Sequence, residues 1–482
     1  MNDLDSARIL LYHPLGPTPD ACRKKALRLT SVTPPLGLAS LAAWLESQGF
    51  RADIFDAYAM PDRETADRRL FAALRETRPG WFGISCTTSL FNDGVRVARA
   101  VRDILPDLRI VFGGPHVSAL RERLLERCPE ADAFVVGEGE QALAELMKRG
   151  LAQAAAVPGL AYRDETGRAM FSGRRDVSGF DLDRLPFPAY DKLAGFPRAY
   201  SLPLFGYPRT PATPCLSSRG CPYACGYCDR SVFGRSYRFH SAAYVYRHLA
   251  FLKTRYGVRH VTFYDDQFTF DRERIVRLCE QLIAEPLRMT FSCAVRPDHL
   301  DTELMTLMKR AGCWTVSVGI ETGDPGTLAG HRHNPDLPFL AEQVRLIKRA
   351  GLRVKGLLMM GLPGESEAAI RRSMDFVLKL PLDEIGIARF TPFPGSALYE
   401  RVRDLGEFDE DWDKMDCLHF QFVPHGMTRA DLERLFQLFY RRYFMRPATL
   451  ARYMSMMWRA PDSWKRFWLN AGSFGRFALG RK

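Results

Sequence analysis

The chain has 482 residues, of which 46% are hydrophobic and 26% are charged. These proportions are ordinary for a folded globular protein and exclude a wholly disordered chain, and the length suits two or three domains. Lys and Arg number 68 against 56 Asp and Glu, a net charge of +12. That charge is compatible with a nucleic acid, an anionic membrane surface or an acidic small molecule, and does not choose among them.

Neither the first residues nor the apolar stretches of the sequence suggest export or membrane insertion. The first residues are polar and acidic, unlike a secretory signal, and no stretch reaches the roughly 18 uninterrupted apolar residues of a spanning helix. We therefore expect a cytoplasmic protein. In a reducing compartment its 11 cysteines serve as metal ligands, reactive thiols or buried side chains rather than as disulfides.

Residues 1–150 alternate between short apolar runs and helical patterns. This order predicts a doubly wound, Rossmann-like parallel α/β domain. The predicted strands are 8–13, 51–56, 81–87, 108–113 and 131–136. The predicted helices are 35–48, 92–104, 117–128 and 138–149.

The rest of the chain divides into three segments. Residues 151–210, with a hairpin at 160–172 and several prolines, are predicted to be a connector that packs on both neighbours. Residues 211–395 predict a partial (β/α)6 TIM-like barrel, and residues 396–482 a helical extension with no further strand. The barrel strands are predicted near 214–218, 259–264, 289–295, 314–320, 353–359 and 384–390. Its helices are predicted near 242–256, 271–284, 301–311, 337–350 and 365–379.

Cys221, Cys225 and Cys228 stand in the sequence CPYACGYC, directly after the first predicted barrel strand. Three thiolates on a tight loop can each bind one iron of a [4Fe–4S] cube and leave the fourth iron open. Such a loop lies at the C-terminal ends of barrel strands, where barrel chemistry occurs. The alternative is structural zinc with Cys215 as fourth ligand, although the spacing differs from the paired knuckles of zinc sites.

This C-x3-C-x2-C spacing, with the aromatic Tyr227 before the last cysteine, resembles the signature of the radical S-adenosylmethionine (SAM) superfamily. The resemblance implies that Cys221, Cys225 and Cys228 hold a [4Fe–4S] cluster whose open iron binds SAM. It also implies an external one-electron reductant and cleavage of SAM to a 5′-deoxyadenosyl radical. The protein then supplies position and exclusion of water.

Further barrel positions resemble SAM contacts of that superfamily. Asp265 and Asp266 follow the second strand, at the place of the contact to the SAM amino group, and helix capping is their alternative role. Glu321 ends the fourth strand and matches a contact to the methionyl or ribose part. Gly361, in GLLMMGLPGE, matches the adenine-contact motif, where glycine permits close backbone approach. Arg296 is either the partner of a ligand carboxylate or a member of an ordinary ion pair.

Small and hydroxyl side chains follow the third, fourth and fifth predicted strands of the first domain. Ligands bind at these strand ends in doubly wound folds, and glycines let the backbone approach a large ligand while hydroxyls hydrogen-bond amides or phosphate. No GxGxxG is present, which disfavours a dinucleotide; ordinary βα turns are the alternative. The residues are Thr87, Thr88, Ser89, Gly113, Gly114, Gly137 and Gly139.

The segment TPPLGLASLAAWLESQG and the GGPH and VVGEGE turns make this domain resemble the cobalamin-binding domain of the B12-dependent radical SAM class. The resemblance covers about residues 7–400 and implies that those seven residues lie near the corrin. Other cobalamin domains carry D-x-H-x-x-G, whose histidine binds cobalt. Here Leu11 replaces the acid before His13, so nothing is expected to orient that imidazole. We therefore expect base-off cobalamin with a weak protein ligand or none, and His116 as a polar surface residue.

The combined resemblance implies an enzyme that methylates an unactivated carbon of a small-molecule or lipid-like substrate. The alternative within the class is an oxidative cyclase or rearrangement enzyme, related to the anaerobic magnesium-protoporphyrin cyclase. A methylthiotransferase needs a second three-cysteine site, for which Cys22, Cys86 and Cys128 are the candidates, and a non-catalytic cobalamin sensor needs no cluster. The candidates for the substrate mouth are Arg389, Tyr399, His425 and the segment 391–395 with Phe393.

Residues 441–482 hold ten Lys or Arg and one acid, Asp462, so this segment carries +9 of the net charge. Nine aromatic residues and four methionines interleave with the basic ones. Such a helical segment is typical of an element lying in the plane of a membrane surface. The alternatives are a tail packed on the barrel with solvated arginines, or a nucleic-acid patch. We expect peripheral contact with the inner face of the membrane and no nucleic acid.

Overall fold

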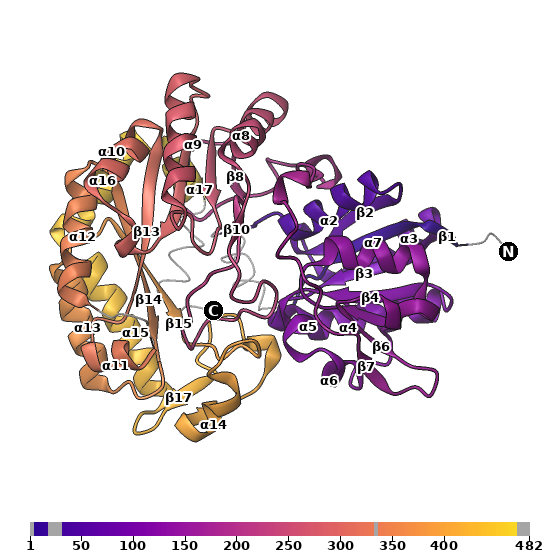
Figure 1. Cartoon of the computed structure of the whole chain (residues 1–482). Coiled ribbons are helices and arrows are strands. Elements are labelled where there is room, and N and C mark those ends of the chain that lie inside the picture. The colour runs from indigo at the N-terminus through magenta and orange to yellow at the C-terminus, as the bar shows by residue number, and fades with distance from the viewer. Residues whose placement is uncertain (1–3, 18–30, 332–335, 470–482) are drawn as a thin grey trace.

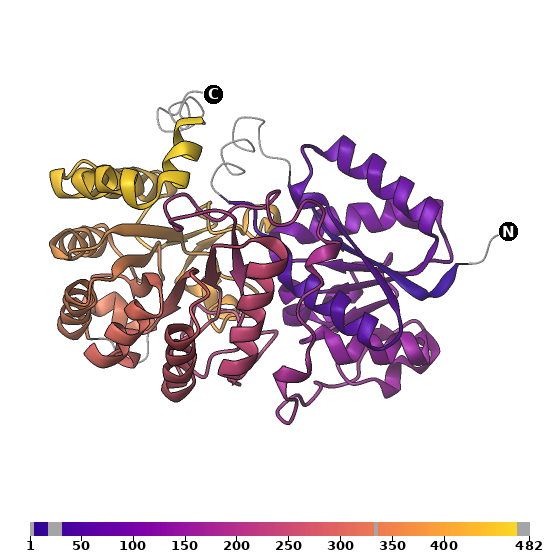
Figure 2. The same cartoon turned by 90° about the horizontal axis from the view of Figure 1, so that it is seen from above.

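Two parallel β-sheets organise the chain, each in its own domain, and a group of helices follows the second (Figure 1). The computed structural model describes residues 4–17, 31–331 and 336–469. The two sheets lie side by side in both views, so that the domains face each other across a long boundary (Figure 2).

The first sheet has the order β2-β1-β3-β4-β5-β6-β7. Strands β1 to β5 are parallel, whereas β6 and β7 form an antiparallel hairpin that extends the sheet beyond residue 150. The strands are β1 (Asp5–His13), β2 (Arg51–Asp56), β3 (Pro79–Ser85), β4 (Arg109–Gly113), β5 (Ala133–Val135), β6 (Leu160–Arg163) and β7 (Ala169–Phe171). The predicted doubly wound architecture and the hairpin are confirmed.

Helices cover both faces of this sheet because successive strand residues alternate between two apolar clusters. One cluster joins the sheet to α2 and α7, and the other joins it to α3 and α4. The helices are α2 (Leu36–Ser47), α3 (Arg63–Thr77), α4 (Phe91–Ile104), α5 (Pro115–Leu120), α6 (Glu122–Leu125) and α7 (Gly139–Arg149). The single helix predicted at 117–128 is wrong: it is broken into α5 and α6 at Arg121, whose φ is 50°. Helix α3 was not predicted.

The segment after β7 contacts both domains. The N–H of Ala189 donates to the carbonyl of Ala39 in α2 at 3.0 Å. One residue later, the Tyr190 hydroxyl lies 3.1 Å from Nε2 of His248 in the barrel. Tyr190 is fully buried, so this segment is packed rather than a free linker.

The second sheet has the order β15-β14-β13-β12-β11-β8, and all its pairs are parallel. Its edge strands β8 and β15 do not pair with each other, so the sheet is an open half-barrel, which confirms the partial barrel. The strands are β8 (Ala212–Cys215), β11 (His260–Phe263), β12 (Thr290–Val295), β13 (Cys313–Glu321), β14 (Arg353–Met360) and β15 (Glu384–Arg389). The helices are α8 (Ala242–Tyr256), α9 (Arg272–Ala284), α10 (Thr302–Arg310), α11 (Pro325–His331), α12 (Leu337–Arg349) and α13 (Glu367–Lys379).

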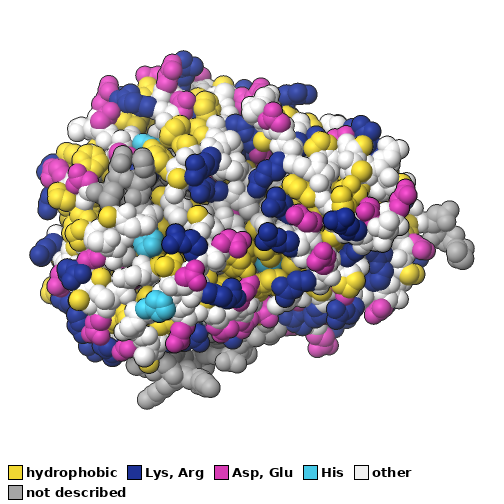
Figure 3. Space-filling model, turned by 60° about the horizontal axis from the view of Figure 1, so that its bottom comes forward, with side chains coloured by type: hydrophobic (Ala, Val, Ile, Leu, Met, Phe, Trp, Pro, Cys, Tyr) yellow, Lys and Arg dark blue, Asp and Glu magenta, His cyan; other side chains and the backbone are white. Residues whose placement is uncertain are grey.

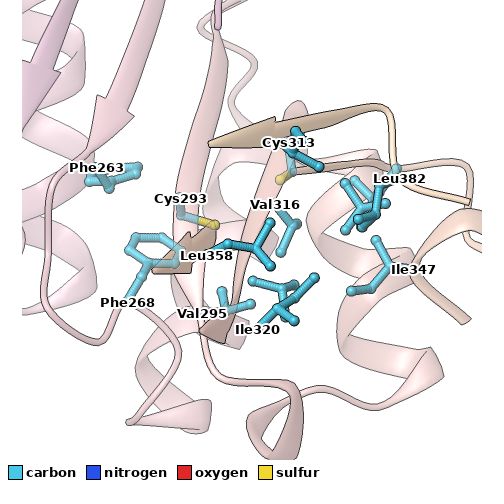
Figure 4. Close-up of a cluster of buried hydrophobic side chains, with 14 of the residues drawn as sticks. Phe263, Phe268, Cys293, Val295, Cys313, Val316, Ile320, Ile347, Leu358 and Leu382 are labelled. Atoms are coloured by element: carbon cyan, nitrogen blue, oxygen red, sulfur yellow. The ribbon is translucent and has the colours of Figure 1, made fainter. Parts of the chain in front are cut away.

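The core of the half-barrel is apolar (Figure 4). Phe263 and Phe268 stack with their ring centroids 4.6 Å apart, and Val316 and Ile320 of β13 are fully buried. Fully burying side chains of this kind contributes about 1.5–3 kcal/mol each. Cys293 lies in the same cluster, so its thiol belongs to the core rather than to a ligand site.

Two short antiparallel ribbons interrupt the helical pattern. The ribbon of β9 (Ser218–Arg219) and β10 (Arg238–Phe239) frames the cysteine loop. The ribbon of β16 (Gly406–Phe408) and β17 (Phe422–Pro424) follows residue 395, so the prediction of no strand there is wrong. Gly406 permits that pairing, because a Cβ at this position would lie 2.2 Å from the Val423 carbonyl oxygen.

The chain continues with α14 (Val402–Leu405), α15 (Arg429–Phe444), α16 (Pro447–Arg459) and α17 (Pro461–Leu469). The last two helices lie together along one edge of the molecule (Figure 2). They cover the N-terminal ends of barrel strands, since Asp462 accepts from the N–H of Thr210 just before β8 at 2.7 Å. None of the helices in the described ranges is long and apolar enough to cross a membrane.

Candidate functional site

A cavity of about 800 Å³ lies where the two domains meet. One wall comes from the C-terminal ends of the strands of the first sheet, and the other from the cysteine loop and the half-barrel. Most of the predicted site residues line it: Thr87, Thr88, Gly113, Gly114, Gly137, Gly139, Cys221, Cys225, Tyr227, Cys228, Asp266 and Glu321. Ser89, Asp265 and Gly361 do not line it.

The cysteine loop is held tightly at its start. Gly220 has a φ of 86°, and a Cβ there would lie 2.2 Å from the Ser236 carbonyl oxygen, so only glycine lets the loop leave β9 at this angle. Farther along, the N–H of Cys228 donates to the carbonyl of Cys225 at 3.2 Å. This turn brings the last two cysteines to the same side of the loop.

The three thiols line the cavity, as ligands of an iron–sulfur cluster would. A hydrogen bond between Cys225 and Cys228, followed by burial, raises the pKa of the Cys228 thiol, and burial raises the pKa of Cys221. All three face the cavity. A [4Fe–4S] cube takes each of three thiolates at a separate corner.

The zinc alternative lacks its fourth ligand. Cys215 is fully buried at the end of β8, and its Sγ lies 3.6 Å from Nδ1 of His248. Burial raises the pKa of that thiol well above its ordinary value. Cys215 therefore stays with the barrel core and apart from the cavity-lining cysteines.

The two neighbouring aspartates have different surroundings. Asp265 is buried below the cavity and accepts hydrogen bonds from the N–H of Ser217 at 2.6 Å and from its hydroxyl. Asp266 lines the cavity, and burial together with the charge of Asp265 raises its pKa. Neither caps α9, whose N-cap is Asp271. Of the pair, Asp266 is the residue placed to meet a ligand.

Glu321 ends β13 with a φ of 63°, a left-handed conformation that is uncommon for a non-glycine residue and often marks a functional site. It lines the cavity, and its charge contributes to the raised pKa of Cys228. A Cβ on Gly319 would lie 2.6 Å from Oε1 of Glu321, so this glycine leaves room for the carboxylate.

Gly361 lies away from the cavity, below Phe420. Its N–H donates to Oε2 of Glu365 at 2.7 Å, and burial raises the pKa of Glu365 to about 7. The residues of β13 and β14 that do line the cavity include Ser317 and Leu357. The adenine contact assigned to Gly361 stays a prediction.

Glycine turns form part of the first-domain wall, beside apolar side chains such as Leu11 and Val111. Gly114 has a φ of 102°, and a Cβ there would lie 2.5 Å from the carbonyl oxygen of Cys86. Gly137 also has a positive φ, 85°, and its N–H donates to the Ser118 hydroxyl at 2.9 Å. The turns after β4 and β5 therefore require glycine at positions 114 and 137 for conformational reasons, and these glycines leave backbone facing the cavity.

His116 is fully buried, and the expectation of a surface position is wrong. Its ring lies 4.5 Å from that of Trp412 and 4.8 Å from that of Phe91, and Nδ1 lies 3.2 Å from the Thr88 hydroxyl. Burial lowers its pKa to about 3, so the imidazole is neutral. It supports the turn that carries Thr88 and does not line the cavity.

An acid does orient the His13 imidazole, contrary to the expectation from Leu11. Oδ1 of Asp56 in β2 lies 2.8 Å from Nδ1 of His13, and Oδ2 accepts from the Tyr200 hydroxyl at 3.0 Å. His13 nevertheless does not line the cavity, whereas Leu11 does. This placement agrees with the absence of a His13–cobalt bond, which stays a prediction.

An ion-pair network that was not predicted from the sequence crosses the domain boundary at the cavity. Arg219 contacts Glu138 at 2.6 Å and Glu140 at 2.5 Å, while Arg238 also pairs with Glu138. All four side chains are largely buried. Burial alone would raise the pKa of Glu140, but the charge and hydrogen bond of Arg219 hold it below its ordinary value. The sequence signal for this network is the pair of acids, Glu138 and Glu140, in the VVGEGE turn.

The mouth candidates separate in the structure. Phe393 lines the cavity, whereas Arg389 pairs with Glu433 at 3.0 Å outside it. Tyr399 and His425 do not line it either. Arg296 lines the cavity and also forms an ion pair with Asp298 at 3.0 Å, so its two predicted roles are compatible.

The protein is a two-domain α/β protein. A Rossmann-like domain and a parallel half-barrel with a three-cysteine loop meet at one shared cavity. Comparison with known protein families agrees. Residues 26–147 match the B12 binding domain, and residues 216–377 match the radical SAM superfamily. The chain thus combines a B12-binding domain with a radical SAM domain that follows it.

Individual proteins resemble the chain over most of its length. An uncharacterized methyltransferase of Pyrococcus horikoshii is 29% identical over 455 residues, 92% of this chain and 94% of that protein. The anaerobic magnesium-protoporphyrin IX monomethyl ester cyclase of Rubrivivax gelatinosus is 26% identical over 86% of this chain and 75% of its own. Among solved structures, the radical SAM methyltransferase TsrM of Kitasatospora setae has a TM-score of 0.65 at 20% identity, covering 89% of this chain and 85% of that one. The chain is a methyltransferase-like radical SAM enzyme.

Proposed function

We propose that this enzyme uses cobalamin and SAM to methylate an unactivated carbon of a small-molecule or lipid-like substrate. The observation that carries the proposal is the shared cavity of about 800 Å³, onto which both cofactor walls open. Cys221, Cys225 and Cys228 would hold a [4Fe–4S] cluster on one side. The glycine turns after β4 and β5 would lie against the corrin on the other.

When bound, the cluster and SAM supply hydrogen-atom abstraction, and cobalamin supplies the methyl group, a combination suited to a carbon that has no lone pair. The chain's own residues supply position. Asp266 offers a carboxylate to an ammonium group, and Glu321 offers a second acceptor beside Cys228. Apolar side chains of the first sheet, such as Leu11 and Val111, exclude water from the same space.

The test is anaerobic reconstitution of the full chain with iron, sulfide, SAM, methylcobalamin and a one-electron reductant. The expected results are retained cobalamin, 5′-deoxyadenosine from SAM, and an extract metabolite heavier by one CH2 unit in mass spectrometry. Failure to form 5′-deoxyadenosine under every reducing condition would overturn the radical mechanism. A chain that retains cobalamin without a cluster would instead favour a cobalamin carrier.

Oxidative cyclisation is the second candidate, because the similarity to the magnesium-protoporphyrin cyclase extends over 86% of this chain. The same experiment separates the two: ring formation removes hydrogen from the metabolite and adds no carbon. A methylthiotransferase is less well supported. Cys86 and Cys128 are fully buried in the first-domain core, and Cys22 lies outside the described residues.

A further inference from the structure

Helices α16 and α17 carry an exposed apolar surface that the catalytic proposal does not use. Trp458 is 77% exposed, Leu469 75%, Met445 70% and Trp468 65%. Met445 lies just before α16, and residues 445–469 hold seven of the 13 large exposed hydrophobic side chains in the described chain. We call this surface the outer face, and its members are Met445, Leu450, Met454, Met457, Trp458, Trp468 and Leu469.

The outer face is a distinct side of α16. Leu450, Met454 and Met457 recur at intervals of three and four residues, so they lie on one side of the helix. The opposite side packs inward: Met456 is fully buried, with its sulfur 2.7 Å from a guanidinium nitrogen of Arg353 at the start of β14. The helix is therefore held to the barrel by one apolar side while a second apolar side faces outward.

The charges around the outer face have one sign. The one acid in α16 and α17 is Asp462, and it is occupied by the N–H and the hydroxyl of Thr210, at 2.7 and 2.8 Å. Arg441, Arg459 and Lys465 are exposed and form no ion pair within the described ranges. On the face shown in Figure 3, by contrast, basic and acidic side chains interleave.

We propose that the outer face docks the enzyme in the plane of an anionic lipid bilayer. Exposed Trp and Leu side chains suit the boundary between headgroups and acyl chains, and each nearby cation adds attraction to anionic headgroups. A second copy of the chain is a poorer match, because a surface on which several basic side chains face a single acid, Asp462, repels its own copy.

Docking in this way places the cavity away from the lipid. The outer face covers the N-terminal ends of barrel strands, where Asp462 meets Thr210 before β8. The cysteine loop follows the C-terminal end of the same strand. The contact therefore tethers the enzyme and does not open the cavity into the bilayer, so this proposal stands independently of the methylation proposal.

The test is co-sedimentation of the full chain with vesicles of phosphatidylcholine alone or mixed with phosphatidylglycerol. The chain is expected to bind the mixed vesicles and to leave them at high salt. Trp458→Ala with Trp468→Ala should weaken binding at least about tenfold, and Arg459→Glu with Lys465→Glu should abolish the preference for anionic lipid. The matched controls are Phe339→Ala and Arg255→Glu, on other exposed helices.

Three outcomes would overturn the proposal: no binding of the full chain to mixed vesicles, equal binding by the tryptophan variant, or a dimer that dissociates on Trp458→Ala. The helix variants can also be tested in a chain that lacks residues 470–482. If they still change vesicle binding by the same amount there, the proposal is supported. Formation of 5′-deoxyadenosine, measured without vesicles, should be the same in all these variants, which separates a failure of docking from a failure of catalysis.

Discussion

The two walls of the cavity are built on opposite principles. The barrel wall works by what its side chains offer: thiols on the 221–228 loop and carboxylates at Asp266 and Glu321. The first-domain wall offers space between apolar side chains such as Leu11 and Val111, because glycine turns such as that at Gly114 leave backbone where further side chains would stand. A cluster needs specific donors, whereas a large flat ligand needs space and a rigid frame.

The largest expected effect comes from removing a donor. Cys225→Ala should abolish formation of 5′-deoxyadenosine, because two thiols leave one corner of the cluster without its ligand. Cobalamin retention should be unchanged, since that wall is intact. Both are measured by chromatography after anaerobic reconstitution. Cys279→Ala, a buried cysteine of α9, is the control and should retain activity; loss of cobalamin in C225A would show that the walls are not separable.

The second prediction concerns a larger side chain in the first-domain wall, which would occupy cavity space. A Cβ on Gly113 would meet Val135 at an ordinary 3.7 Å, so Gly113→Val adds a side chain to the cavity without forcing the backbone. Overpacking of about 1–3 kcal/mol predicts cobalamin binding weaker by up to about a hundredfold, measured by titration followed in the visible spectrum. Cleavage of SAM should continue. Gly179→Val, with no neighbour within 4 Å, is the control, and unchanged cobalamin binding in G113V would contradict the assignment.

The smallest expected effects distinguish the roles of two adjacent acids, Asp265 and Asp266. Asp266→Asn should raise the KM for SAM by about tenfold, the value of one charge-assisted hydrogen bond, with stability unchanged. Asp265→Asn should instead lower the free energy of unfolding by about 2 kcal/mol, because it weakens the buried contacts to Ser217. Denaturant unfolding and SAM kinetics check both. The reverse pattern would assign the ligand contact to Asp265.

Much of this architecture could be predicted from local pattern. Residues 51–56 and 242–256 coincide with β2 and α8 because alternation or helical periodicity is complete within each segment. Helix α3 was missed because only Ala66, Leu70 and Leu74 of its 15 residues are buried, too thin a stripe to stand out. The two-residue ribbon of β9 and β10 carries no period at all.

Only those parts of the cavity that depend on a local sequence pattern could be predicted. The cysteine spacing is a chemical signal contained in eight residues. The partners of His13 and the burial of His116 depend on Asp56 and Trp412, which lie far away in sequence, so no local pattern contains them. Asp265 and Asp266 alternate in exposure along the chain, and only the packed structure shows which of them meets the cavity.

The bridge of Arg219 and Arg238 to Glu138 and Glu140 has a consequence for how such a protein can be taken apart. A foreign domain joined to the barrel without acids at positions 138 and 140 would bury the guanidiniums of Arg219 and Arg238 with no carboxylate partner. Stranding charges in this way typically costs about 3–5 kcal/mol. The two halves are therefore not interchangeable modules: a graft of a foreign corrin domain has to bring its own pair of acids, or inherit a barrel whose arginines have also been replaced.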